Sequence, residues 1–191
     1  MNPALRIVVA GGIGSGKSTV GRLLSERGVY VIDADAVGHG VLNDPAVVEE
    51  VMRWWPGAVS GGVVDRARLG AKVFADPDDL RRLEAITHPA IKSRIRELAA
   101  AQGSAPVAVE LPLMPEWLGP GWMVWVIDAA EDTRVARIVG RGGTPTDAAA
   151  RMAAQPTRDI WLDAADHVIR NDGDLAELES AVDAAWERFA G

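Results

Sequence analysis

The sequence predicts an α/β fold in which a five-stranded parallel sheet carries helices on both faces. Three observations lead to this prediction. Short apolar runs alternate with segments of helical periodicity, a glycine-rich loop follows the first apolar run, and a long helical stretch separates the second run from the third. Strands that alternate with helices favour a parallel sheet that is covered on both faces.

The expected strands are short, continuous apolar runs, which are typical of strands buried on both faces. They are LRIVVA (5–10), VYVI (29–32), VAV (107–109), WMVWVI (122–127) and HVI (167–169). In parallel sheets of this kind, ligands bind beyond the carboxyl ends of the strands. The candidate functional residues all follow such ends or lie in the loops after them.

Helical patterns fill the segments between the strands. They cover residues 18–27, 131–139, 146–154 and 175–189, together with a mostly helical stretch over 35–101. The span 35–103 is too long for a simple crossover, so we expect an inserted helical substructure there. Within it, Trp54 and Trp55 end the first helix and are expected to pack in a core. Pro89 disfavours helix at the preceding residue and predicts a break in the helical stretch.

Composition limits the functions that the chain can have. Its 191 residues suffice for one domain with a substantial core, so we expect residues 1–191 to form a single domain. The net charge of −7 argues against broad binding of nucleic acid or of anionic membranes, which requires a basic face. The chain has no cysteine, so disulfides and thiolate metal sites are excluded.

No transmembrane helix or signal peptide is expected. No apolar run approaches 18 residues, the length that a spanning helix needs. The N-terminal segment MNPALRIVVAGG becomes glycine-rich too early for a signal peptide and is interpreted as the entry to the first core strand. The expected location is therefore cytoplasmic.

The strongest motif is G-x-x-x-x-G-K-[ST], which GGIGSGKS (11–18) matches directly after the first expected strand. Its glycines let backbone N–H groups converge on a polyphosphate, and the following helix directs its positive end at the same anion. Lys17 is expected to reach the β- and γ-phosphates, and the Ser18 hydroxyl to bind Mg²⁺. The alternative is a glycine-rich turn without a ligand. The motif predicts a P-loop NTPase-type fold and an ATP site made of Gly12, Ile13, Gly14, Ser15, Gly16, Lys17, Ser18 and Thr19.

Two carboxylates follow expected strands. Asp33 ends the second strand in VYVIDAD, and Glu110 ends the third in VAVELPL. A kinase needs a carboxylate that orients the attacking hydroxyl and accepts its proton, and an ordinary aspartate is ionised at neutral pH. We therefore expect Asp33 to be the catalytic base, with Asp35 as the N-cap of the next helix. Glu110 is expected to hold a water on Mg²⁺ or to contact the substrate hydroxyl; a helix-initiating acid is the alternative.

A cationic cluster is expected beside the predicted break in the helical stretch. THPAIKSRI brings His88 together with Lys92 and Arg94, one turn on, and such a cluster suits a phosphate-bearing substrate. We therefore predict that His88 and Lys92 bind the substrate. His39 and His167 lack such neighbours and are expected to be structural.

A lid is expected over about residues 137–156. RGGTPT (141–146) is polar, contains glycine and proline, and lies between helices that carry Arg137 and Arg151. Lids are common in phosphoryl-transfer enzymes because they exclude water from the γ-phosphate. One or more of these arginines, with Arg141 foremost, is expected to stabilise the transferring phosphoryl group. A plain surface loop is the alternative.

Two further features lie outside these motifs. Arg134 is expected to be a solvated helix residue. IRNDGDL (169–175) follows the last strand and contains a tight turn. Because this topology places the turn beside the glycine-rich loop, we expect Asn171 and Gly173 to border the adenine, with a turn that binds nothing as the alternative.

In their order along nearly the whole chain, the motifs resemble those of the dephospho-coenzyme A kinase family. The shared motifs are GGIGSGKSTV, VIDAD, VVDRARLGAKVFADPDDLRRLEAITHP, ELPL, the lid, ARMAAQ (150–155) and ADHVIRNDG (165–173). The resemblance implies a helical coenzyme-A-binding insertion and ATP-dependent phosphorylation of the ribose 3′-hydroxyl of dephospho-coenzyme A, the last step of coenzyme A synthesis. It implies that Asp33 is the base, that His88 helps to hold dephospho-coenzyme A, and that Arg141 is the lid arginine. The family usually has Asp where this chain has Glu110, and its continuation differs from ELPLMPEW (110–117).

Two other functions remain open at the level of the residues. A kinase that acts on a nucleoside or a nucleoside monophosphate would share the loop, Asp33 and the lid. An ATP-binding regulatory module would bind nucleotide without transferring phosphate, although Lys17, Ser18, Asp33 and Arg141 argue against it. The expected partners are the small molecules ATP and dephospho-coenzyme A, without an obligate protein partner.

Overall fold

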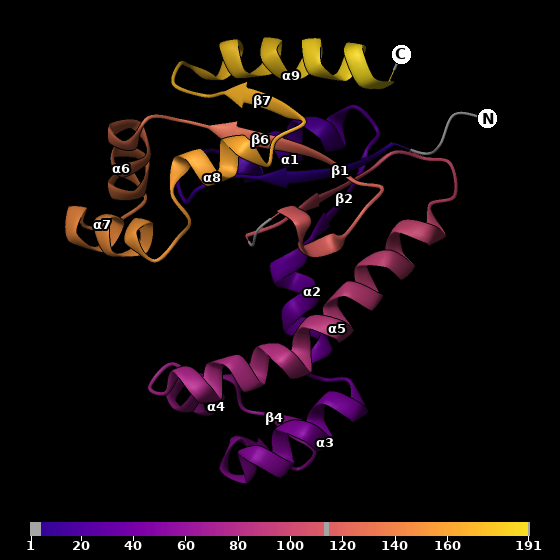
Figure 1. Cartoon of the computed structure of the whole chain (residues 1–191), viewed down its shortest axis with the longest axis vertical. Coiled ribbons are helices and arrows are strands. Elements are labelled where there is room, and N and C mark those ends of the chain that lie inside the picture. The colour runs from indigo at the N-terminus through magenta and orange to yellow at the C-terminus, as the bar shows by residue number, and fades with distance from the viewer. Residues whose placement is uncertain (1–4, 113–114, 191) are drawn as a thin grey trace. The chain divides into compact units, whose positions relative to one another are not determined.

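The computed structural model describes residues 5–112 and 115–190 (Figure 1). The interpretation of the first four residues and the Leu113–Met114 part of ELPLMPEW therefore lie outside the described residues. The chain divides into two compact units. The first comprises Met1–Asp33 and Ala101–Gly191, and the second comprises Ala34–Ala100.

The first unit contains a five-stranded parallel sheet with the order β2-β5-β1-β6-β7. Its strands are β1 (Arg6–Ala10), β2 (Tyr30–Asp33), β5 (Val107–Glu110), β6 (Met123–Asp128) and β7 (His167–Arg170). All five correspond to the expected apolar runs, and the predicted fold class is confirmed. Because β1 is central, the glycine-rich loop leaves the middle of the sheet at its carboxyl edge.

Helices of the first unit are α1 (Lys17–Glu26), α6 (Glu131–Gly140), α7 (Pro145–Ala153), α8 (Arg158–Asp163) and α9 (Leu175–Ala190), with a 3-10 turn at Pro115–Leu118. Four of these helices were expected within one or two residues. Helix α8 was not expected because its six residues are too few to show a helical period. Within the described residues, no helix has both the length and the apolar character that crossing a membrane requires.

One face of the sheet packs against α1 and α9. Alternate strand residues, among them Ile7, Val9 and Trp125, meet Leu23 of α1 and Val182 of α9 in one buried cluster. Val8 and Val109 point to the opposite face and are also fully buried. Burial on both faces explains why the strands are continuous apolar runs and not alternating ones.

The second unit is mostly helical, as expected. It contains α2 (Ala34–Val41), α3 (Pro45–Trp54), α4 (Arg66–Val73) and nearly all of α5 (Pro77–Ala101), with a short antiparallel hairpin of β3 (Val59–Ser60) and β4 (Val63–Val64). The hairpin was not predicted. Gly61 and Gly62 form its two-residue turn with φ of 57° and 78°, a conformation that two glycines adopt without strain.

The predicted break at His88 was wrong, because α5 continues through Pro89. A proline removes one helical hydrogen bond and strains the preceding turn. Apolar residues on both sides of it, including Leu83, Ile86 and Ala90, pack against the core of the second unit. Packing along the helix therefore outweighs the local preference.

Two smaller expectations about the second unit also need correction. Asp35 lies inside the first turn of α2 and is not the residue that precedes the helix. Its carboxylate still faces the favourable end of the helix dipole. Trp55 is buried as expected, but Trp54 is half exposed and lies under the guanidinium of Arg82, 3.9 Å from the ring centroid.

Candidate active site

The glycine-rich loop joins β1 to α1 at the centre of the sheet. Gly11, Gly14 and Gly16 have φ of 137°, 80° and 106°, which side chains rarely adopt. Gly11 and Gly16 also allow close approach. A Cβ added to Gly11 would lie 2.4 Å from the Ile127 carbonyl oxygen, and one added to Gly16 would lie 2.2 Å from Nδ2 of Asn171. The loop therefore needs glycine for its backbone path and for its packing.

The Lys17 side chain folds back over the loop. Its ammonium group donates hydrogen bonds to the carbonyl oxygens of Gly11, at 2.8 Å, and of Gly12, at 3.3 Å. The side chain is half-buried, whereas Ser18 at the next position is exposed. The loop thus holds a positive charge over its own backbone at the start of α1.

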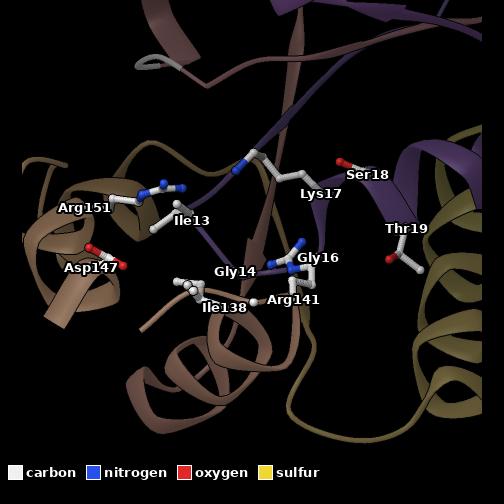
Figure 2. Close-up of a pocket in the computed structure, with 12 residues that line it drawn as sticks. Ile13, Gly14, Gly16, Lys17, Ser18, Thr19, Ile138, Arg141, Asp147 and Arg151 are labelled. Atoms are coloured by element: carbon white, nitrogen blue, oxygen red, sulfur yellow. The ribbon is translucent and has the colours of Figure 1, made fainter. Parts of the chain in front are cut away.

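A cavity of about 590 Å³ opens between the loop and the helices that follow β6 (Figure 2). In Figure 2 the ends of the Lys17 and Arg151 side chains point toward one another. The volume of this cavity falls within the range of small-molecule sites. The lining residues are Ile13, Gly14, Gly16, Lys17, Ser18, Thr19, Ile138, Arg141, Gly142, Gly143, Asp147 and Arg151.

Charge in this cavity favours an anion. Lys17, Arg141 and Arg151 contribute three positive groups against the single carboxylate of Asp147. That carboxylate already accepts hydrogen bonds from the backbone and hydroxyl of Thr144 in a capping box at the start of α7. These bonds, helped by the charge of Arg151, hold the pKa of Asp147 below its ordinary value. The charge of Asp147 is therefore held by its hydrogen bonds at the start of α7.

A second cavity, of about 450 Å³, shares Gly14, Gly16 and Thr19 with the first. It is lined on its other side by Asn171 and Gly173 of the turn after β7, and by Leu175 and Leu178 of α9. Arg137, Gly140 and Asp174 complete the lining, together with Arg141, which also lines the first cavity. The turn after β7 therefore borders the loop, where the sequence placed it; the contact with adenine stays a prediction.

Asn171 is buried and holds the loop directly. Its Nδ2 donates to the carbonyl oxygen of Ser15 at 2.7 Å, and its Oδ1 accepts from Arg137 at 3.1 Å. Arg137 also donates to the Ser15 carbonyl at 3.4 Å. Arg137, one of the three arginines among which a partner of the transferring phosphate was expected, is thus engaged with the loop from α6.

Two loop contacts were missed by the sequence analysis. Arg134, expected to be solvated, is half-buried and donates through Nε to the carbonyl oxygen of Ile13 at 3.0 Å. Burial lowers the pKa of Arg134, although Glu131 and Asp128 oppose that effect. Gln155 accepts from the backbone N–H of Ile13 at 2.7 Å. Two signals were available: Arg134 and Arg137 are three residues apart and therefore share a helix face, and Gln155 ends the ARMAAQ motif (150–155).

Asp33 and Glu110 lie together at the carboxyl edge of the sheet, because they are register partners in β2 and β5. The Asp33 side chain is exposed and does not point into the core. Glu110 lies against α1: a Cβ added to Gly21 would be 2.0 Å from its Oε1. The missing side chain at Gly21 therefore makes room for the Glu110 carboxylate, one helical turn after Ser18.

His88 and Lys92 lie on α5 in the second unit, four residues apart and so on one face. Burial lowers the pKa of His88, with Glu84 raising it and Lys92 lowering it further. His88 is therefore neutral at physiological pH, and the expected cationic cluster is weaker than predicted. Arg94 points elsewhere on the helix and pairs with Glu97 at 3.3 Å.

Comparison with known proteins identifies the family. The sequence profile of the family described as dephospho-CoA kinase matches residues 5–177. The chain belongs to the dephospho-CoA kinase family. The dephospho-CoA kinase of Deinococcus radiodurans is 44% identical over 96% of this chain and 92% of its own length. The Streptomyces avermitilis enzyme of the same name is 44% identical over 95% of this chain and 92% of its own length.

Solved structures agree with family membership. The crystal structure of TT1252 from Thermus thermophilus has a TM-score of 0.85 and 34% identity, over the full length of both chains. The dephospho-CoA kinase from Campylobacter jejuni has a TM-score of 0.67 and 25% identity, over 96% of each chain. A shikimate kinase from Bacteroides thetaiotaomicron, at 18% identity and a TM-score of 0.59, shares the fold. The chain is therefore a kinase with a P-loop fold.

Proposed function

We propose that the chain transfers the γ-phosphoryl group of ATP to the ribose 3′-hydroxyl of dephospho-coenzyme A, giving coenzyme A and ADP. The observation that carries the proposal is the cation-lined cavity at the glycine-rich loop, with the exposed Asp33 at the same edge of the sheet. Membership of the dephospho-CoA kinase family supports dephospho-coenzyme A as the phosphoryl acceptor. The proposed location is the cytoplasm, where ATP is available, and no protein partner is needed.

In this proposal the loop binds the polyphosphate of ATP through its backbone N–H groups. Lys17 exchanges its contacts with Gly11 and Gly12 for the β- and γ-phosphates, and Arg141 neutralises charge on the transferring group. Asn171 and Gly173 border the adenine in the adjoining cavity. Segment 137–156 acts as the lid, since it supplies Arg141 and Arg151 to the cavity.

Mg²⁺ fits the oxygen donors at the start of α1. Within the described residues no three acidic, histidine or cysteine side chains form a metal cluster. An ion held by the Ser18 hydroxyl, phosphate oxygens and water needs no such cluster. Glu110 of β5, whose carboxylate lies against Gly21 one helical turn after Ser18, is proposed to orient a bound water. The ion would supply neutralisation of charge between the β- and γ-phosphates.

Asp33 is the proposed base. Its ionised carboxylate orients the 3′-hydroxyl and accepts its proton as the oxygen attacks the γ-phosphorus and the bond to ADP breaks. Exposure at the sheet edge suits this role, because an acceptor must reach the carboxylate. His88 and Lys92 are proposed to hold dephospho-coenzyme A from the second unit, His88 as a neutral hydrogen-bonding group and Lys92 as a charge.

The test is a comparison of acceptors. ADP release is measured with Mg²⁺ and ATP plus dephospho-coenzyme A, a nucleoside monophosphate or no acceptor, and the product is identified by mass and phosphorus NMR. We expect ADP and coenzyme A in equal amounts with dephospho-coenzyme A, and only background release in the other two reactions. Faster transfer to the nucleoside monophosphate would contradict the proposal, as would ATP binding without any product.

A further inference from the structure

We infer that Arg134 and Gln155 are positioning residues that hold the glycine-rich loop in its phosphate-binding conformation by gripping both polar groups of Ile13. Arg134 Nε donates to the Ile13 carbonyl oxygen at 3.0 Å, and Gln155 Oε1 accepts from the Ile13 N–H at 2.7 Å. We call this pair the Ile13 clamp. The inference rests on the proposed function only in that the loop binds ATP.

The clamp sets the direction of two peptide groups. A planar trans peptide points its C=O and the following N–H to opposite sides. Arg134 Nε holds the Ile13 carbonyl oxygen, so the N–H of Gly14 points to the side opposite that contact. Gln155 Oε1 holds the Ile13 N–H, so the Gly12 carbonyl of the same peptide points to the opposite side. There its oxygen accepts hydrogen bonds from the Ser15 N–H, at 3.2 Å, and from Lys17 Nζ, at 3.3 Å.

The peptide that joins Ser15 to Gly16 is oriented in the same way. Asn171 and Arg137 donate to the Ser15 carbonyl oxygen, which directs the N–H of Gly16 to the opposite side. Gly14 and Gly16 both line the 590 Å³ cavity. Donors fixed before the ligand arrives cost no reorganisation when the polyphosphate binds, so side chains outside the cavity strengthen binding inside it.

The absence of a side chain at Gly12 leaves room for the Arg134 guanidinium. A Cβ added there would lie 2.8 Å from Cζ of Arg134 and 2.9–3.0 Å from its two terminal nitrogens. The guanidinium thus rests on the Gly12 backbone, and any side chain at Gly12 would push it aside. Arg134 comes from α6, and Gln155 follows α7 by two residues. The clamp therefore ties the loop to α6 just before the proposed lid, through Arg134, and to the end of that lid, through Gln155.

The test measures the dissociation constant of Mg²⁺–ATP by calorimetry, which needs no acceptor. We expect Arg134→Met and Gln155→Met each to raise it about tenfold, with the KM for dephospho-coenzyme A changed less than twofold. Arg134→Lys should recover most of the affinity, because its ammonium can donate to the Ile13 carbonyl. Gln155→Met involves no change of charge, so its effect cannot come from lost attraction to phosphate.

Gly12→Ala separates placement from charge. The added methyl group displaces the Arg134 guanidinium without removing its charge. We therefore expect Gly12→Ala to weaken ATP binding as Arg134→Met does. Added to Arg134→Met, it should cost less than twofold more, because nothing remains to displace. If Arg134→Met fails to fold, Gly12→Ala and Gln155→Met carry the test.

Dissociation constants within twofold of the wild type in folded variants, with only the melting temperature lowered, would overturn the inference and leave a purely structural role. The outcome is independent of the acceptor. Weakened ATP binding in a chain that fails to phosphorylate dephospho-coenzyme A would support the clamp and refute the proposed reaction. Unchanged ATP binding in variants that still phosphorylate dephospho-coenzyme A would refute the clamp and support the proposed reaction.

Discussion

Gly21 determines where the Glu110 carboxylate lies. Glutamate is one methylene longer than aspartate, and its Oε1 occupies the space that a Cβ at Gly21 would fill, 2.0 Å from that position. Glycine inside a helix costs about 1 kcal/mol relative to alanine. In return, the space left by the missing side chain on α1 lets the Glu110 carboxylate lie against the helix face that also carries Ser18.

Gly21→Ala is predicted to displace the Glu110 carboxylate. Because alanine favours the helix, we expect the variant to fold, but its Mg²⁺ requirement should rise about tenfold. The measurement is the rate of ADP formation across a Mg²⁺ titration at saturating ATP. Glu110→Asp in the Gly21→Ala background should restore much of the response, because the shorter side chain clears the new methyl group. An unchanged titration would show that Glu110 has no part in holding the ion.

At the scale of single elements, α7 begins with a capping box that also tunes a residue of the cavity. The Thr144 hydroxyl accepts from the Asp147 N–H at 3.1 Å, and the Asp147 carboxylate accepts from the Thr144 N–H at 3.3 Å. This reciprocal pair satisfies two backbone donors at the start of the helix. It also keeps Asp147 ionised in a cavity meant for an anion.

Thr144→Val is predicted to raise the pKa of Asp147 toward its ordinary value, because the depressed pKa comes chiefly from the Thr144 side chain. A depressed pKa stabilises the fold above the unfolded value of about 3.9, and this effect is lost as pH falls through the folded pKa. Carboxyl carbon NMR titration of Asp147 measures the change. Thr144→Ser keeps the hydroxyl and should titrate like the wild type; equal titration of the valine variant would refute the assignment.

Helix α5 shows where local sequence signals mislead. Pro89 is a valid reason to expect a break, because the residue before proline avoids helical geometry. The helix continues because Leu80, Leu83 and Ile86 before the proline and Ala90 after it pack on one core. Packing partners far along the chain are not visible in a local pattern. The strands β3 and β4 escaped prediction for a different reason: with two residues each, they are too short to show alternation.

For the whole molecule, the sheet and the binding loop were predictable because they follow from repeated, local rules. Continuous apolar runs mark strands buried on both faces, and the loop motif needs its glycines in fixed positions. The position of Asn171 beside the loop was predictable, but the Ile13 clamp was not. Arg134 and Gln155 contact Ile13 across 121 and 142 residues of sequence, and only the folded chain brings them together.

Stability of the whole molecule is predicted to fall in mild acid. Burial lowers the pKa of His167, which packs edge-on against Trp125 and Phe189 at ring distances of 5.7 Å and 5.3 Å, and Arg188 lowers it further. Burial lowers the pKa of His88 as well. The unfolded chain therefore binds more protons than the folded one once pH falls below about 6.5. The stability present above that pH is lost as pH approaches the folded values.

Thermal unfolding between pH 7.5 and 5.5 measures this effect. We expect the melting temperature to fall with pH in the wild type, and to fall less in His167→Phe, which keeps an aromatic ring between Trp125 and Phe189 but cannot titrate. Arg188→Gln, which removes the nearby charge, should also reduce the slope. Parallel pH profiles for all three proteins would exclude His167 as a source of the dependence.

The role of Asp33 as the base is the central claim, and Asp33→Asn tests it most directly when turnover and ATP affinity are measured on the same sample. Asparagine keeps the shape but cannot accept the proton of the 3′-hydroxyl. We predict that kcat with dephospho-coenzyme A falls at least a hundredfold, while the dissociation constant of Mg²⁺–ATP stays within about twofold of the wild type. Turnover within about threefold of the wild type would contradict the account.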